Sequence, residues 1–207
     1  MMIRPAHFGF NSETAENNYF QKKIPAGSVD ETARQARDEF DAFVDVLRSN
    51  EIEVLVFEDT IAPKTPDAVF PNNWISFHSE GCIVTYPMFA PSRRSERRED
   101  ILQYFIDNFH LSEYLDLNSF EDENLFLEGT GSMILDRVSK IAYACRSERT
   151  AEALFMDFCS KFDYRPVLFD ASDESGQPIY HTNVLMCVGT EVVVVCLEAI
   201  RDLTARK

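Results

Sequence analysis

The segment Ser132-Met-Ile-Leu-Asp-Arg-Val-Ser-Lys-Ile-Ala-Tyr-Ala-Cys145 places two apolar runs around a polar turn at 136–140. Two short runs rich in β-branched and aromatic residues around such a turn predict a β-hairpin. The same pattern occurs at residues 74–88 and at residues 183–197, so the hairpins start 58 and then 51 residues apart. The chain therefore carries an internal repeat of 50–60 residues.

Helical and strand patterns fill the intervals between these hairpins. Apolar residues at helical spacing predict helices at 29–49, 93–108 and 147–162, the last with Ser147 as its N-cap. A short strand is expected after each helix, at 52–57, 115–117 and 166–169. The predicted repeat unit has the order helix, strand, loop and hairpin. It occurs three times, at about 29–88, 89–145 and 146–197, and a further helix is expected to start in 198–207. Repeats of this size are typical of a propeller or an array; the alternative is an ordinary α+β sheet whose rhythm is a coincidence.

Composition limits the classes of partner. The chain has 207 residues, 45% of them hydrophobic, and a formal net charge of −15. This length fits one domain or two small ones, and the hydrophobic fraction is enough for a sizeable core. Such a charge repels nucleic acid and anionic membrane surfaces, so we expect neither as a partner. The longest apolar run, 192–197, is far shorter than the ~20 residues needed to span a bilayer. The N-terminus, 1–10, lacks the apolar segment of a signal peptide.

The five cysteines indicate a reducing compartment. Their number is odd, they form no CxxC pair, and Cys82, Cys145, Cys187 and Cys196 all sit within apolar runs. This pattern predicts buried free thiols in a cytoplasmic protein rather than a disulfide framework. Metal-binding spacings and a glycine-rich phosphate loop are both absent from the sequence, so no metal and no cofactor is predicted.

Polar residues stand just before each hairpin. If the three units are related by rotation, these equivalent positions converge, which brings together Asn73, Glu128, His181 and Asn183. A carboxylate, an imidazole and two carboxamides around one pocket form a general acid/base arrangement with hydrogen-bonding clamps. Each residue also has a simpler interpretation. Glu128 fits a solvated loop, His181 fits a structural histidine, and Asn73 fits a turn after proline.

Two arginines occupy corresponding places at the starts of successive helices. Arg93 follows the first hairpin and Arg149 follows the second. Because a guanidinium binds a carboxylate through two parallel hydrogen bonds, both arginines are candidates for binding a substrate carboxylate. A solvated helix start is the alternative, and we favour it for the neighbouring Arg97 and Arg98.

Several motifs together resemble one family, the guanidino-group-modifying (pentein) superfamily of arginine deiminase and amidinotransferase relatives. The likeness is strongest to the citrulline-utilisation hydrolases. It rests on Arg4-Pro5 with Phe8-Gly-Phe-Asn11, Phe70-Pro-Asn-Asn-Trp74, Tyr86-Pro-Met88, Arg93-Arg94 with Glu96-Arg97, Leu127-Glu-Gly129, Ser147-Glu-Arg-Thr150 and His181-Thr-Asn183.

The resemblance implies a five-bladed ααβ-propeller, here about three of five repeats, and a cysteine hydrolase acting on the guanidino or ureido carbon of an arginine- or citrulline-type substrate. By motif, Glu128 is the carboxylate that grips the substrate nitrogens and His181 is the acid/base group. Arg93 and Arg149 correspond to the clamp on the α-carboxylate.

Two departures from the family pattern affect the expected activity. Asn73 and Asn183 stand where the deiminases often have aspartates, and asparagine suits a neutral ureido group better than a cationic guanidinium. The family's nucleophilic cysteine lies in a C-terminal glycine-rich segment that this sequence lacks. We therefore expect a truncated chain that is inactive alone. It would be an amino-acid-binding pseudoenzyme, a remnant, or a chain completed by a second copy or a complementing chain.

Overall fold

The computed structural model describes residues 1–23, 28–202 and 204, which form a mixture of helices and strands as expected. They separate into two compact units, described here one at a time. The first unit consists of Met1–Pro71 and Ala90–Leu111, and the second unit consists of Asn72–Phe89 and Ser112–Lys207. Among the helices of the described residues, none combines the length and apolarity needed to cross a bilayer.

The first unit is built around helix α1 (Val29–Ser49), which connects strand β1 (Met2–Arg4) to strand β2 (Val56–Glu58). The two strands pair in parallel. Phe40 and Val44, one helical turn apart, are buried in the apolar cluster beside them. The helix predicted from the apolar spacing at 29–49 is thus confirmed, and burial of that stripe fixes it in place.

The helix predicted at 93–108 is wrong in its extent, because the structure has two helices there. These are α2 (Pro91–Arg94) and α3 (Glu99–Asn108). Between them Arg98 adopts an extended backbone, and its guanidinium binds both carboxylate oxygens of Asp100 at 2.6 Å. This side-chain pair supports a new helix start where the apolar spacing alone suggested continuity.

Two sheets of the second unit share one topology. In each, two antiparallel strands form a hairpin, and a third strand pairs in parallel with the second. The strands are β3 (Ile75–His78), β4 (Cys82–Thr85) and β5 (Glu113–Asp116) in one sheet, and β6 (Met133–Asp136), β7 (Ile141–Cys145) and β8 (Arg165–Phe169) in the other. The hairpins predicted at 74–88 and 132–145 are confirmed. Each third strand joins the hairpin that precedes its helix, a pairing that the sequence pattern did not reveal.

The third predicted hairpin is also present. Strands β9 (Met186–Val188) and β10 (Val193–Val195) pair antiparallel. A single 3-10 turn, η6 (Leu197–Ala199), follows them. The further helix expected to start in 198–207 falls partly outside the described residues, which omit 203 and 205–207.

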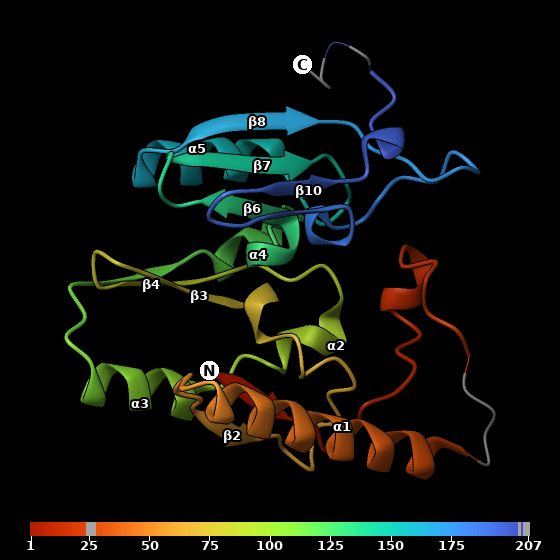
Figure 1. Cartoon of the computed structure of the whole chain (residues 1–207), viewed down its shortest axis with the longest axis vertical. Coiled ribbons are helices and arrows are strands. Elements are labelled where there is room, and N and C mark those ends of the chain that lie inside the picture. Colours follow the sequence, from red (N-terminus) through yellow and green to blue (C-terminus); the bar gives the residue numbers. More distant parts are fainter. Residues whose placement is uncertain (24–27, 203, 205–207) are drawn as a thin grey trace. The chain divides into compact units, whose positions relative to one another are not determined.

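Helix α5 (Glu152–Phe162) supplies much of the core of the second unit. Figure 1 shows it behind β7 and β8. Phe155 and Phe158 from α5 are buried in one cluster with Ala142 and Ala144 of β7. The small side chains of β7 leave room for the aromatic rings, and fully burying such a ring contributes about 1.5–3 kcal/mol.

Ser147 is not the N-cap of α5, because the helix begins five residues later with Ala151 at that position. The Ser147 hydroxyl instead donates to the backbone oxygen of Tyr180 at 2.8 Å and accepts the backbone N–H of Arg149 at 3.2 Å. Ser147 therefore builds the turn that presents Arg149. Serine serves turns and caps by the same side-chain chemistry, so sequence alone did not separate the two.

All five cysteines are free thiols, as predicted, but they are not all buried. Cys82, Cys145 and Cys159 are buried, whereas Cys187 and Cys196 are exposed. The expectation of burial was wrong for these last two. Cys187 lies on a two-stranded hairpin, and the alternation along β9 turns it outward between Met186 and Val188.

Candidate functional site

A tight turn at Glu128-Gly129 begins the candidate site in the second unit. Glu128 precedes the short helix α4 (Gly129–Ser132), and Gly129 has a positive φ of 45°. A Cβ at Gly129 would overlap the backbone oxygen of Asn72. Only glycine meets both conditions, the left-handed backbone and the close approach of another chain segment. The turn thereby holds the Glu128 side chain inside the unit.

The Glu128 cluster, meaning Glu128, Arg149 and His181, is buried. Oε2 of Glu128 lies 2.7 Å from Nε2 of His181 and 3.4 Å from Nη1 of Arg149, and its Oε1 accepts the backbone N–H of Phe89 at 3.0 Å. Glu128 is 0% exposed, Arg149 1% and His181 4%. A buried carboxylate is tolerated only when it is paired and hydrogen-bonded, and these three contacts provide both.

Hydroxyl groups join the backbone segments that carry the cluster. Ser132 Oγ donates to the backbone oxygen of Arg149 at 2.6 Å and accepts the backbone N–H of Glu128 at 2.9 Å. Thr182 Oγ1, next to His181, donates to the backbone oxygen of Ser132 at 2.5 Å. All three cluster residues therefore sit on segments tied together through Ser132, which fixes their mutual geometry.

Asn73 approaches His181 across Gly131. Asn73 ends the 3-10 turn η3 (Pro71–Asn73) and is buried. A Cβ at Gly131 would overlap Nδ2 of Asn73 and would lie 2.8 Å from Cε1 and 2.9 Å from Nδ1 of His181. The carboxamide and the imidazole thus both lie where a side chain at position 131 would be, and glycine leaves them room. Asn183, in contrast, is exposed to solvent.

Aromatic rings hold the guanidinium of Arg149. Its Cζ lies 4.8 Å from the ring centroid of Tyr180 and 5.9 Å from that of Phe89. Arginine stacks readily on aromatic faces, and such contacts strengthen when they are shielded from water. In this structure Arg149 therefore serves as the counter-ion of Glu128, and its guanidinium packs against the rings of Tyr180 and Phe89. Its expected part in binding a substrate carboxylate stays a prediction.

Arg93 belongs to the first unit, whereas the Glu128 cluster belongs to the second. Arg93 is buried, and it binds Glu96 through Nε to Oε1 at 2.9 Å and Nη2 to Oε2 at 2.8 Å. Asp67 is also buried and lies 3.9 Å from Nε of Arg93. The Asp67 carboxylate accepts a 2.8 Å hydrogen bond from Nδ2 of Asn11. The sequence analysis did not identify Asp67 as a partner of Arg93. The one indication in the sequence was that Asp67 lies three residues before the Phe70-Pro71 motif.

The chemistry open to the Glu128 cluster follows from its donors and acceptors. An ionised carboxylate only accepts, so His181 donates its Nε2–H to Glu128. This orients the imidazole, as an acidic partner does for a catalytic histidine. The His181 imidazole is thus held in one orientation beside a carboxamide and a carboxylate.

The buried thiols are poorly suited to nucleophilic attack. The Cys145 thiol donates to the backbone oxygen of Ile179 at 3.5 Å, and burial raises its pKa. Burial also raises the pKa of Cys82, and it raises the pKa of Cys159 to about 11. Because the thiolate is the reactive form, these three groups are protonated and inert at neutral pH.

Comparisons with known proteins give a family and a fold. The family model described as "N,N dimethylarginine dimethylhydrolase, eukaryotic" matches residues 4–207. A search of curated proteins gives no significant match. Among solved structures, the N-terminal domain of a mutant of ArgZ, an arginine dihydrolase from the ornithine-ammonia cycle in cyanobacteria, bound to substrate, is 18% identical with a TM-score of 0.73. The match covers 99% of this chain and 68% of that one.

Two further structures are similar. The ternary complex of AgrE with ornithine and NAD+ is 18% identical, with a TM-score of 0.74 over 99% of this chain and 27% of that one. A dimethylarginine dimethylaminohydrolase adduct with 4-chloro-2-hydroxymethylpyridine is 14% identical, with a TM-score of 0.60 over 79% and 60%. In apo ArgZ the match spans 26% of that chain. At these identities the structures show a shared fold. Together with the family match over nearly its whole length, they place this chain in the eukaryotic N,N dimethylarginine dimethylhydrolase family of the guanidino-group-modifying superfamily.

Proposed function

We propose that this chain binds the guanidino or ureido head group of an arginine- or citrulline-type amino acid at the Glu128 cluster. Glu128 grips the nitrogens of the head group, and His181 is the group that gives and takes protons. The supporting observation is the 2.7 Å contact between a wholly buried carboxylate and the imidazole, with Asn73 close by. A planar head group with several N–H donors is the natural complement of such acceptors.

Charge favours a neutral head group over a cationic one. Arg149 already balances the negative charge of Glu128, so a second cation gains little there. The carboxamides of Asn73 and Asn183 offer both donors and acceptors, which match the C=O and N–H groups of a ureido substrate. We infer that citrulline or an acylated relative binds more tightly than free arginine. Within the second unit, we propose Arg149 by motif for the substrate carboxylate.

The cysteine mechanism implied by the family resemblance uses a thiolate, and the three buried cysteines are unsuited to supply one. We therefore propose that the 207-residue chain binds its ligand without turning it over. The second candidate is a chain that becomes active when a partner, either a second copy or a complementing chain, supplies the nucleophile. The two candidates predict different results when a partner is added: the binding-only chain forms no product, whereas the partner-dependent chain does.

The repeated topology supports a partial ααβ-propeller with about three of five blades. Two sheets have the same hairpin-plus-parallel-strand order, and β1 and β2 repeat the parallel pair around α1. The hairpin β9–β10 adds the antiparallel pair of a further blade. The single partial domain 1–207 with repeat units at about 29–88, 89–145 and 146–197 stays a proposal. The observed sheets cross these unit limits, because β5 and β8 pair with the hairpins that precede their helices.

Isothermal titration calorimetry with citrulline and with arginine tests the binding site. Glu128→Gln keeps the shape of the side chain and removes its charge, and we expect it to weaken citrulline binding by at least about tenfold. Glu123→Gln, an exposed change at the end of the preceding 3-10 helix η4 (Asn118–Glu123), is the matched control and should bind as the unaltered chain does. If Glu128→Gln fails to fold, His181→Asn tests the same site. Equal affinity of both Glu variants, or tighter binding of arginine than citrulline, contradicts the proposal.

Product analysis tests the absence of turnover. The purified chain, incubated with citrulline, should release no ornithine or ammonia above background while still binding the ligand. Measurable turnover by the chain alone would refute this part. Turnover that appears only after a second protein is added would support the partner-dependent alternative instead.

A further inference from the structure

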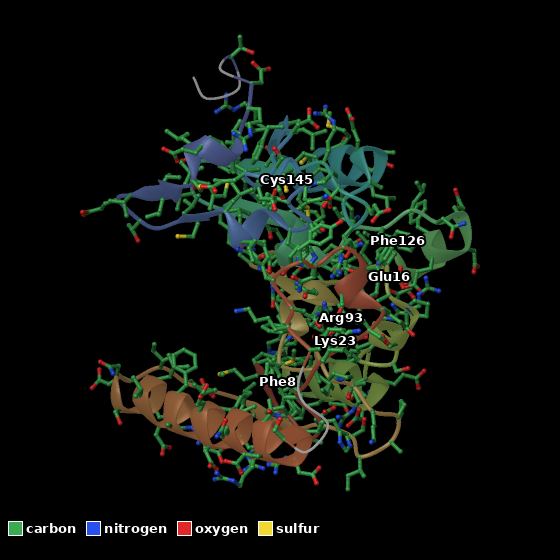
Figure 2. The ribbon with its side chains drawn as sticks, turned by 90° about the vertical axis from the view of Figure 1, so that its right-hand side faces the viewer. Phe8, Glu16, Lys23, Arg93, Phe126 and Cys145 are labelled. Carbon is green, nitrogen blue, oxygen red and sulfur yellow. The ribbon has the colours of Figure 1, made fainter. Side chains whose placement is uncertain are left out.

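A cavity of about 560 Å³ lies in the first unit. The described residues that line it do not include Glu128, Arg149 or His181. Its lining comes from the segment after β1, from the N-terminal part of α1 and from the loop before Asp67. Figure 2 shows Phe8, one of the lining residues, near the N-terminal end of α1. All the described residues that line the cavity belong to the first unit.

The lining combines an apolar surface with two cations. Phe8 and Phe10 supply aromatic rings, and Ala33 is a small buried residue of α1. Arg37 and Lys64 supply positive charge. Ligand sites in proteins are commonly cavities of about 300–1,000 Å³ that are mostly apolar and hold a few well-placed polar groups. This cavity has that size and that composition.

The charge of the cavity is opposite to that of the whole chain. Arg37 and Lys64 outnumber the lining carboxylate of Asp30, whereas the chain carries a net charge of −15. Arg37 donates one hydrogen bond, from Nη1 to the backbone oxygen of Ala6 at 3.1 Å. A guanidinium has five N–H donors, so this bond anchors the side chain and leaves capacity for a carboxylate.

His7 adds a fixed polar group to the cavity. Its Nε2 lies 2.8 Å from the backbone oxygen of Ile61, and a carbonyl only accepts, so Nε2 carries the proton and donates. This bond ties the segment after β1 to the loop that carries Lys64. The lining is therefore held by hydrogen bonds at both Arg37 and His7.

We propose that this cavity is a second ligand site, which takes a small organic carboxylate with a flat apolar body. The carboxylate binds Arg37 and Lys64, and the apolar body lies against Phe8 and Phe10. A neutral or cationic ligand of the same shape would lose the charged contact. The cavity's described lining residues belong to the first unit, whereas the Glu128 cluster belongs to the second.

Three probes separate the two parts of the recognition. Phenylacetate carries both a ring and a carboxylate, phenylacetamide keeps the ring without the charge, and acetate keeps the charge without the ring. NMR titration of the labelled full chain should show saturable shifts with phenylacetate at Phe8, Phe10 and Ala33. Phenylacetamide and acetate should bind at least about tenfold more weakly.

Charge variants test the two cations. Arg37→Gln and Lys64→Gln should each weaken phenylacetate binding by at least about threefold, and Asp30→Asn should strengthen it because a repelling carboxylate is removed. Arg34→Gln is the matched control on the same helix. Arg34 is exposed and pairs with Glu31, so this change should leave the affinity unaltered.

A filling variant tests the location. Ala33→Leu places extra atoms at a buried position of the lining and should abolish phenylacetate binding. Glu128→Gln, which targets the second unit, should leave it unchanged, so this proposal and the proposed amino-acid site fail separately. Equal affinity for phenylacetamide, shifts confined to the second unit, or full binding by Ala33→Leu in a folded chain would each overturn the proposal.

Discussion

Acid should destabilise the second unit through His78, the last residue of β3. Its side chain is 7% exposed, it stacks on Phe162 at 4.3 Å between ring centroids, and its Nε2 lies 2.8 Å from Ser76 Oγ. The Ser76 hydroxyl also contacts the Tyr86 hydroxyl at 2.6 Å. Burial lowers the pKa of His78 from 6.5 to about 4, and the nearby positive charge of Arg137 acts in the same direction.

The sign of the effect follows from this lowered pKa. In the unfolded chain His78 takes up a proton as the pH falls through 6.5, whereas in the folded chain it stays neutral until about pH 4. Between these values the unfolded state binds more protons, so the free energy of unfolding decreases as the pH falls. The full shift is worth about 3 kcal/mol, and about 2.5 kcal/mol of that is lost between pH 7.5 and pH 4.5.

Urea unfolding at pH 7.5, 6 and 4.5 measures this loss. His78→Gln retains a hydrogen-bonding side chain but cannot titrate. Between pH 7.5 and pH 4.5 the free energy of unfolding of this variant should therefore decrease by about 2–3 kcal/mol less than that of the unaltered chain. His110→Gln changes an exposed histidine and should follow the unaltered chain. The carboxylates that titrate in the same pH range contribute equally to both proteins. Their contribution therefore cancels when the unfolding free energy of the variant is subtracted from that of the unaltered chain. Identical pH dependence of His78→Gln and the unaltered chain would refute the reasoning.

Three further changes test the packing and the site. Phe155→Ala empties a fully buried position of α5 and should cost about 3–5 kcal/mol of unfolding free energy, measured by urea denaturation. Arg149→Gln leaves the Glu128 carboxylate without its buried cation and should cost about 3–5 kcal/mol, whereas adding Glu128→Gln to it should restore part of the loss in a double-mutant cycle. Gly131→Ala places a methyl group onto Asn73 and should lower both the melting temperature and the affinity for citrulline; an unchanged melting temperature would show that the turn relaxes freely.

The elements of this fold were readable from sequence because their patterns are local. The spacing of apolar residues predicted α1, α5 and the three hairpins, and burial of those residues explains why. Failures arose where side-chain chemistry overrode the pattern. Arg98 begins α3 through its pair with Asp100, and Ser147 shapes a turn instead of capping a helix.

The candidate site was predicted by equivalence between repeats. That reasoning brought Glu128 and His181 together correctly in space, since their side chains touch. It did not anticipate that Arg149 pairs with Glu128, nor that Asp67 joins Asn11 in the first unit. Such pairings depend on which buried groups need a counter-charge, and that is decided by three-dimensional packing rather than by spacing along the chain.

The strand order has a kinetic consequence. Within each hairpin the paired residues are close in sequence, as His78 and Cys82 are, so the hairpins can close within microseconds. The parallel partners are far apart in sequence: α2 and α3 lie between Cys82 and Glu113, and α5 lies between Ile141 and Arg165. Closing these longer loops costs more entropy, so the third strands should be added last and should set the folding rate. Hydrogen exchange pulsed during refolding would then protect β3–β4 and β6–β7 before β5 and β8.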